Sequence, residues 1–311
     1  MNTLQKVLVV GATGALGRPV VKLLLQRGVA VRALNRHPEQ AADLQDLGAE
    51  VVAGDLTDEA SLRRACQGVT RVLAAAHGLL GRGRYRSEEV DDLGHRMLIV
   101  AAQAAKVQRL VYTSGHGVSA EHPIDFFRTK YRMEQFLATS GLDTVILKPT
   151  AFMEHHVHQF NGQVVLSKGK ARLVGQGSKP RNFICAADVA KFAVRALLED
   201  PPPFRRLDIG GHDHASNSEV AAMYARAAGI APAASHAPAR VVGALGRLAA
   251  PFHPGAARLM RLLSLPDDAF DEHFDGAAAL EQQYGIRLTR LQAFIDQQVR
   301  AAADAAAHKP A

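Results

Sequence analysis

The feature that most constrains this chain is the segment VLVVGATGALGRPVV at residues 7–21. Residues 6–10 read KVLVV and are apolar and mostly β-branched after Lys6, which predicts a buried strand, and apolar residues recur at helical spacing after the last glycine. Glycines in this strand–turn–helix context allow a tight turn and let backbone N–H groups approach a pyrophosphate at the positive end of a helix. The segment therefore predicts a dinucleotide-binding loop. The expected loop residues are Gly11, Thr13, Gly14, Ala15, Leu16 and Gly17.

Strand and helix patterns alternate six times before Pro149. This alternation predicts a parallel sheet with helices on both faces and right-handed crossovers. We therefore expect an α/β fold, a Rossmann-type doubly wound parallel sheet with a smaller C-terminal substrate lobe. The expected strands are residues 6–10, 29–34, 49–53, 70–76, 108–113 and 143–148, followed by 206–210. The expected helices include residues 39–47, 91–105, 126–140, 188–198, 216–228 and 288–302.

The pattern becomes irregular after Pro149. Residues 1–150 are expected to form the cofactor-binding core, completed by about 186–210, and residues 151–185 with 211–300 the substrate lobe. Glycines punctuate 161–185, which predicts short strands and loops there. We expect the Ala-rich helices near 240–262 to be core rather than an interface. A frayed tail is expected at 303–311.

Composition excludes several classes of protein. The net charge of +7 fits either simple solubility or an anionic ligand such as a phosphorylated cofactor. The densest basic stretch, residues 81–86, is short and runs into acidic residues, so we expect no nucleic-acid binding. No run approaches the ~18 apolar residues of a membrane span, and the first residues do not form a secretory signal. The two distant cysteines, Cys66 and Cys185, suggest reduced thiols in a cytoplasmic protein.

The end of the second strand bears on cofactor choice. NAD sites often place an acidic residue there, but this chain has Leu34-Asn35-Arg36. Arg36 can form a bidentate pair with a 2′-phosphate, and Arg18 can reach the same group. The pattern predicts NADP(H) in preference to NAD(H). The alternative is that Arg36 is a solvated charge at the entry to a helix.

The sequence resembles the atypical short-chain dehydrogenases/reductases of the NmrA-like and isoflavone-reductase-like group, over roughly residues 4–225. The resemblance rests on several blocks in order. They are GATGALGR (11–18), RALNR (32–36), GDLTD (54–58), RLVYTSG (109–115), Lys130 with Glu134, LKPTAF (147–152) and ICAADVA (184–190).

The resemblance implies roles for further residues at the ends of the strands. Asp55 and Leu56 would flank the adenine. Ala75, Ala76 and His77 would line the path to the nicotinamide ribose, although a histidine at a strand end is more often structural. Thr113 and Ser114 would lie near the nicotinamide. Its carboxamide would be covered by Pro149, Thr150 and Ala151.

The segment DFFRTKYRMEQ departs from the usual pattern of this group. Short-chain dehydrogenases generally use a YxxxK helix, whereas here Phe126 precedes Lys130 by four residues. Tyr131 does not replace the missing phenol, because adjacent helical residues point ~100° apart. Lys130 is then a desolvated catalytic acid/base, a group that only holds the ribose, or a solvated helix charge.

The lobe offers apolar substrate-side residues rather than a metal site. We expect a pocket for a small apolar substrate that includes Phe152, Met153, His155 and Phe160. The histidine-rich stretches at 154–158 and 212–214 lack the spacing of known metal motifs, so no metal is expected. We expect an oxidoreductase that uses NADPH to reduce a small apolar carbonyl, enone or quinone. The alternative is a non-catalytic, NADP(H)-sensing NmrA-like regulator or assembly factor, with a homodimer or a regulatory protein as partner.

Overall fold

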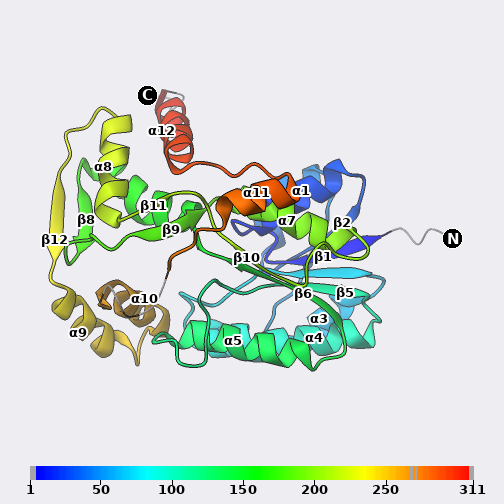
Figure 1. Cartoon of the computed structure of the whole chain (residues 1–311). Coiled ribbons are helices and arrows are strands. Elements are labelled where there is room, and N and C mark those ends of the chain that lie inside the picture. Colours follow the sequence, from blue (N-terminus) through cyan, green and yellow to red (C-terminus); the bar gives the residue numbers. More distant parts are fainter. Residues whose placement is uncertain (1–4, 267–268, 270–271, 308–311) are drawn as a thin grey trace.

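The computed structural model describes residues 5–266, 269 and 272–307. In this part of the chain, seven strands form one parallel sheet in the order β10-β6-β5-β4-β1-β2-β3 (Figure 1). This is the doubly wound order expected from the sequence, so the predicted fold class is confirmed. The strands are β1 (Lys6–Val10), β2 (Ala30–Asn35), β3 (Glu50–Ala53), β4 (Arg71–Ala74), β5 (Arg109–Thr113), β6 (Asp143–Pro149) and β10 (Arg206–Ile209).

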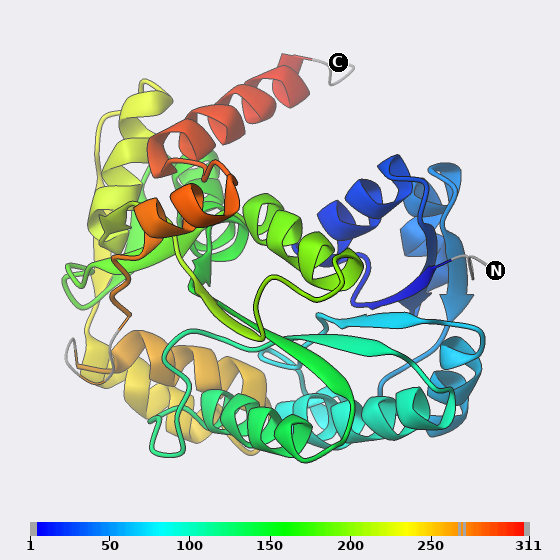
Figure 2. The same ribbon diagram turned by 45° about the vertical axis from the view of Figure 1, so that its right-hand side comes forward.

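Helices cover both faces of this sheet (Figure 2). One face is covered by α1 (Gly17–Gln26), α2 (Ala42–Asp46, after the 3-10 turn Pro38–Ala41), α7 (Ala186–Leu198) and α11 (Ala277–Tyr284). The other face is covered by α3 (Glu59–Cys66), α4 (His95–Ala104) and α5 (Asp125–Ala138). A π-helical segment, η3 (Glu88–Gly94), leads directly into α4, after a short 3-10 turn at Gly83–Tyr85. Asp58 caps α3 by accepting hydrogen bonds from the first turn.

Strand alternation explains why both faces are buried. In β1, Val7 and Val9 pack in the core beneath α1 and α7, while Leu8 and Val10 pack against α3 and α4. All four side chains are at most 2% exposed. A parallel strand with helices on both sides has no solvent face, which accounts for its uninterrupted apolar sequence.

The lobe lies at one end of the sheet and has its own small core (Figure 1). Three of its strands form one sheet, β7 (Ala151–Phe152), β9 (Arg181–Ile184) and β11 (His214–Ala215). Two more pair in parallel, β8 (Ala171–Val174) and β12 (Ala234–Ala237). Its helical segments are η4 (Met153–Gly162, π-helical), α6 (Gln163–Lys168), α8 (Asn217–Ala227), α9 (Ala239–Ala249), α10 (Pro254–Ser264) and α12 (Leu291–Ala307).

The secondary structure of the lobe and of the predicted tail differs from the sequence predictions. Residues 161–168 are helical rather than strand or loop, because the chain from Met153 onward packs apolar side chains at helical spacing in the lobe core. The tail prediction is wrong for 303–307, since α12 continues to Ala307 through an Ala-rich stretch with high helix propensity. Residues 308–311 of that predicted tail, and residues 1–4, lie outside the described residues.

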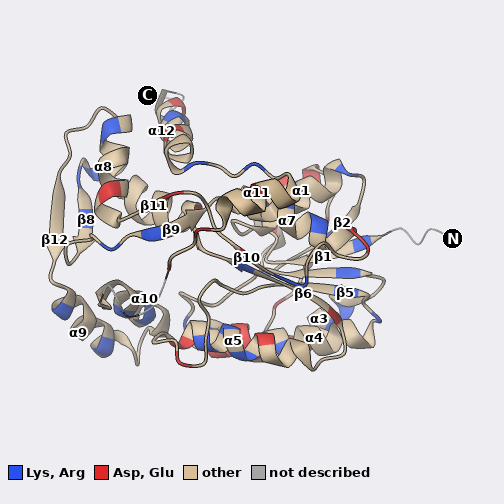
Figure 3. Cartoon of the chain, in the orientation of Figure 1, with Lys and Arg blue, Asp and Glu red and all other residues tan. Residues whose placement is uncertain are grey.

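The prediction that the helices near 240–262 form core is also wrong. In α9 only Gly246 is buried, and four large apolar side chains on this helix and just after it are exposed. Figure 3 shows basic but no acidic residues on α9 and α10. No described helix has the length and apolar character needed to cross a membrane.

Candidate functional site

The glycine loop joins β1 to α1 as predicted. Gly11 has a φ of +89°, and a Cβ at this position would lie 2.7 Å from the backbone nitrogen of Ala76. A Cβ at Gly17 would overlap the carbonyl oxygen of Gly11. Helix α1 has no side-chain cap and no acidic residue in its first turn, so no carboxylate on that turn offsets the positive end of its dipole. The exposed Gly14 and this helix end fit the pyrophosphate of a dinucleotide.

The two side chains at the rim of this loop are already engaged. The guanidinium of Arg18 pairs with Asp43 of α2 and holds the pKa of that carboxyl below its usual value. Thr13 accepts a hydrogen bond from the side chain of Asn35 at 3.2 Å, which ties the loop to the end of β2.

A cluster of arginine and tyrosine side chains covers the ends of β2 and β3. The guanidinium carbon of Arg36 lies 4.4 Å from the ring centroid of Tyr85, and that of Arg84 lies 5.0 Å from the same centroid. Arg84 also donates a hydrogen bond to Asp55 at 3.0 Å. Leu56 beside it is 6% exposed. The segment after β4 thus brings a second guanidinium to the expected adenine end, and Arg36 stacks on an aromatic ring.

The carboxyl ends of β4, β5 and β6 lie side by side. A doubly wound sheet binds its ligand in the crevice outside these strand ends, and we call this region, together with the glycine loop, the cleft. Ser114 N donates to Leu147 O at 2.8 Å, and Thr150 N donates to Ile209 O at 2.9 Å. The hydroxyl of Ser114 donates to Glu134 at 2.5 Å, so it points toward α5. The predicted residues brought together at these strand ends are Ala75, Ala76, His77, Thr113, Ser114, Pro149, Thr150 and Ala151.

His77 is exposed and lies beside the phenylalanine that replaces the usual tyrosine. Its ring centroid is 6.0 Å from that of Phe126 in an edge-to-face contact. Protein atoms crowd the imidazole and lower its pKa to about 4, although the Asp91 carboxylate opposes the shift. Lys130 and His155 add to the lowering through their positive charge. His77 is therefore neutral at neutral pH.

Lys130 is buried beneath the cleft and only 4% exposed. Its ammonium donates to the carbonyl oxygen of Thr113 at 3.0 Å and lies 3.7 Å from Asp91. Asp91 is fully buried and also accepts from Gly78 N at 3.0 Å and from Ser87 Oγ at 2.7 Å. Burial lowers the pKa of Lys130, and the Asp91 carboxylate opposes that shift. Lys130 is not a solvated helix charge, so that interpretation is wrong.

The predicted pocket residues of the lobe divide into two groups. Met153 is fully buried in the lobe core, so its assignment to the pocket is wrong. Phe152 is half-buried and packs against the core of the main sheet. His155 and Phe160 are also partly open, and Phe160 packs edge-to-face on His156 at 5.7 Å.

A pocket of about 200 Å³ lies within the lobe between the β8–β9 turn and the ends of α9 and α10. Arg181 forms part of its wall and holds Glu272 through bonds of 2.8 and 2.5 Å. The same guanidinium lies 3.3 Å from His156, which connects this pocket to the partly open residues of η4. The geometry thus offers space for a small molecule on the lobe side of the strand ends.

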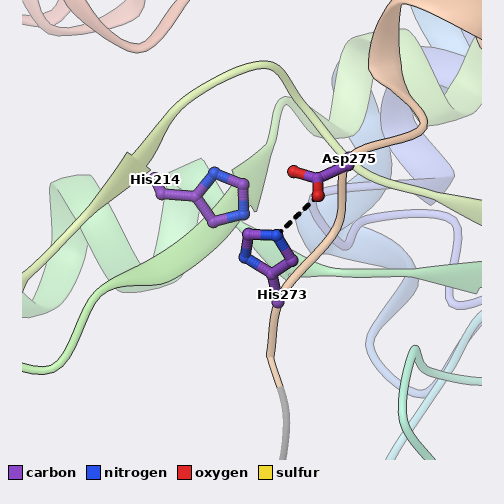
Figure 4. Close-up of side chains that lie close together, drawn as sticks. All are labelled: His214, His273 and Asp275. Carbon is purple, nitrogen blue, oxygen red and sulfur yellow. Dashed lines mark hydrogen bonds and ion pairs between the residues drawn. The ribbon is translucent and has the colours of Figure 1, made fainter.

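His214, His273 and Asp275 form the one described group whose donor atoms all lie within 4.8 Å of one another (Figure 4). The two imidazoles stack 4.4 Å apart with 23° between their planes. His214 Nε2 accepts from Phe274 N at 3.2 Å, and His273 donates to Asp275 at 2.7 Å. A metal ion lies in the plane of each imidazole that binds it, and nearly parallel rings do not direct two lone pairs at one point. The arrangement is that of two stacked histidines, each hydrogen-bonded to a different neighbour.

Three residues of the cleft were not identified from the sequence. Asp91 lies on η3, at the start of the helix predicted for 91–105, and nothing in its neighbours indicates a lysine partner. Arg84 and Tyr85 belong to the basic stretch 81–86, which was considered only for nucleic-acid binding and not for the adenine end.

The comparisons with known proteins agree with this geometry. A family model described as NAD(P)H-binding matches residues 11–200, more than half of the chain. The photosystem II assembly factor Ycf39 of Guillardia theta is 30% identical over 225 residues, which cover 72% of this chain and 71% of that protein. The NAD(P)H azoreductase of Xenophilus azovorans is 30% identical over 224 residues, which cover 72% of this chain and 74% of that protein.

Solved structures show the same fold at lower identity. An NADPH-dependent quinone oxidoreductase from Escherichia coli, complexed with NADPH, has a TM-score of 0.70 and 24% identity, covering 96% of this chain and 100% of its own. A triphenylmethane reductase from Citrobacter sp., complexed with NADP(H), has a TM-score of 0.72 and 21% identity, covering 95% and 99%. The chain therefore belongs to the NAD(P)H-binding family of atypical short-chain dehydrogenases/reductases.

Proposed function

We propose that this protein is an NADPH-dependent reductase of a small apolar quinone, enone or other activated carbonyl. The observation that carries the proposal is the absence of a phenol from the cleft. Phe126 occupies the position of the usual tyrosine and lies against His77. An acceptor that takes hydride readily does not need a strong acid beside it, because positioning alone supplies much of the rate enhancement.

None of the five tyrosines, all in the described part of the chain, replaces that phenol. Tyr112 and Tyr224 are fully buried, in the main core and in the lobe core. Tyr85 lies at the adenine end with Arg36. Tyr131 follows Lys130 on α5 and points away from its face, and Tyr284 packs on α7.

The proton balance of the reduction then rests on two candidate groups. A bound nicotinamide would supply the hydride, which carries two electrons, and one proton from solvent would complete the reduced product. Lys130 has a lowered pKa but only 4% exposure, which suits a group that fixes the ribose and exchanges protons slowly. His77 is exposed and neutral, so it can relay a proton from water to the product oxygen.

The preference for NADP(H) rests on Arg36 and Arg84. Both guanidinium groups lie on Tyr85 at the carboxyl end of β2, where a 2′-phosphate would be held. A guanidinium matches phosphate geometry with two parallel hydrogen bonds. The neighbouring Asn35 has no charge that would repel such a phosphate.

A second function is favoured by the names of several relatives. The Ycf39 proteins at 28–32% identity are called photosystem II assembly factors. A protein of that type would bind the cofactor in the same cleft without turnover, and the missing phenol is compatible with it. The azoreductase at the same identity supports the reductase instead.

The two functions are separated by following NADPH oxidation with a quinone, an enone, an azo dye and an unactivated ketone. We expect quinone and enone to be reduced and the ketone not. Because Lys130 is assigned to the ribose, Lys130→Met should weaken NADPH binding more than it lowers turnover at saturating NADPH. Arg36→Ala should raise the Kd for NADPH about 10- to 100-fold, the loss of one charge-assisted pair, while leaving that for NADH within about twofold. Tight NADPH binding with no acceptor reduced would contradict the reductase and leave the assembly role. Equal losses for NADPH and NADH in Arg36→Ala would contradict the phosphate assignment.

A further inference from the structure

Helix α9 presents an apolar stripe to solvent. Val241, Leu245, Leu248 and Phe252 are spaced by four, three and four residues, so they share one face of the helix and its end. They are 51%, 52%, 72% and 83% exposed. Monomeric proteins seldom leave so many large apolar side chains in one contiguous row uncovered. The stripe is therefore expected to have a partner.

The stripe is held rigidly by the helix behind it. The opposite face of α9 packs on α10 so closely that a Cβ at Gly246 would lie 3.0 Å from that of Met260. On α10, Arg258 is 6% exposed and makes a bidentate pair with Asp125, at 2.8 and 2.7 Å, together with a 2.7 Å bond to Leu79 O. The α9–α10 hairpin is thus anchored to the cofactor-binding core and not a frayed excursion.

The charge around the stripe has one sign. Residues 220–266 contain five arginines and no aspartate or glutamate. Arg240 and Arg247 are seven residues apart on one flank of the stripe, and Arg261 lies on α10; all three are exposed. None of these three forms an ion pair with another described residue. The surface combines apolar side chains with unpaired cations.

We infer that the α9–α10 hairpin is a docking surface for an anionic lipid bilayer. An amphipathic helix with Leu and Phe on one face and arginine beside it lies in the plane of a membrane interface, driven by apolar burial and by attraction to anionic headgroups. A second copy of the chain fits less well, because a twofold contact would bring the same arginines together without an acid to pair them. The net charge of +7 also favours association with a negative surface. The inference does not depend on the proposed reduction.

Sedimentation with vesicles tests this inference on the full-length protein. The wild type should pellet with phosphatidylglycerol vesicles and much less with phosphatidylcholine vesicles. Leu248→Ser/Phe252→Ser should abolish binding. Arg240→Gln/Arg247→Gln should weaken it about 30-fold, taking ~1 kcal/mol per arginine near an anionic surface. The matched control is Lys22→Gln/Arg27→Gln, on α1 and at its C-cap, which removes the same charge from two exposed sites and should bind like the wild type.

A second measurement guards against variants that misfold. The chain contains no tryptophan, so Phe252→Trp introduces a single fluorophore at the end of the stripe. Its emission should shift to the blue with phosphatidylglycerol vesicles and stay unchanged with inorganic phosphate. No pelleting and no shift would overturn the inference, as would equal losses in the control variant. A wild-type dimer in light scattering that Leu248→Ser/Phe252→Ser converts to a monomer would assign the stripe to a second copy and also overturn it.

Discussion

Acidification should destabilise this protein through His95. The imidazole is 1% exposed on α4, and its Nδ1–H donates to Val90 O at 2.8 Å. Its Nε2 has no hydrogen-bond partner among the described residues. Burial lowers its pKa to about 4, and the nearby Lys130 ammonium adds to the shift while Asp91 opposes it. Protonation would therefore leave a second buried cation beside Lys130 with an unpaired N–H.

The magnitude follows from the difference between the folded and unfolded pKa values. The pKa of His95 is about 4 in the folded protein, whereas the ordinary pKa of 6.5 applies in the unfolded chain. Between these two pH values the unfolded state binds a proton that the folded state does not. The contribution of His95 to the free energy of unfolding is therefore fully present above about pH 6.5 and is lost as the pH falls toward 4. A shift of one unit corresponds to ~1.4 kcal/mol, so about 2–3 kcal/mol should be lost between about pH 7 and pH 4.5.

The variant His95→Asn isolates this contribution. An asparagine amide can still donate to Val90 O but cannot take up a proton. The variant also loses the contact between the imidazole ring and Tyr112, and the cost of this loss is the same at every pH. Urea unfolding of both proteins at several pH values should show the wild type losing its advantage by about 2–3 kcal/mol on acidification. Other titrating groups, such as His77 and His156, are common to both proteins and cancel in the difference. Stability curves that run parallel from neutral to acid pH would refute the reasoning.

Three further predictions concern residues whose surroundings are equally specific. Asp91→Ala should lose about 3–5 kcal/mol in urea unfolding, because it leaves the buried Lys130 ammonium without its carboxylate, and Asp91→Asn should lose less because it still accepts a hydrogen bond. Gly17→Ala should abolish NADPH binding in calorimetry, since the new Cβ overlaps the backbone of Gly11. Gly68→Ala meets no atom and strains only its own left-handed backbone, with φ of +69°, far from the loop in sequence, so it should bind normally. Met153→Ala should cost about 2–5 kcal/mol of stability while leaving the KM for the acceptor unchanged, and a raised KM in a stably folded variant would contradict its place in the lobe core.

The strands of the main sheet were predictable because the features that define each strand lie within one short stretch of the sequence. β1 has the predicted bounds, 6–10, and β5 and β6 differ from prediction by one residue at one end. A parallel strand buried on both faces needs a continuous apolar run, and such a run ends where a turn residue follows. The glycine loop was predictable for the same reason, since Gly11 and Gly17 exclude any side chain.

The polar contacts beneath and beside the cleft could not be predicted from the sequence. Lys130 was singled out from its spacing to Phe126, but its partner Asp91 lies 39 residues earlier on a π-helical turn, and only tertiary packing brings them together. The placement of Arg84 over Asp55 depends likewise on the path of the segment after β4. The prediction that α9 belongs to the core failed for a related reason. The spacing of apolar residues shows that this helix has an apolar face, but it does not show whether another element covers that face.

Arg258 connects the α9–α10 hairpin directly to residues near the cofactor cleft. Its guanidinium binds Asp125, at the start of the helix that carries Lys130, and Leu79 O, two residues beyond His77. The two residues that Arg258 contacts therefore lie close in the sequence to Lys130 and His77, which we place beside the cofactor. Any effect between the two sites must then be reciprocal. If binding of the hairpin to a surface changes the affinity for NADPH by some factor, NADPH changes the affinity for that surface by the same factor.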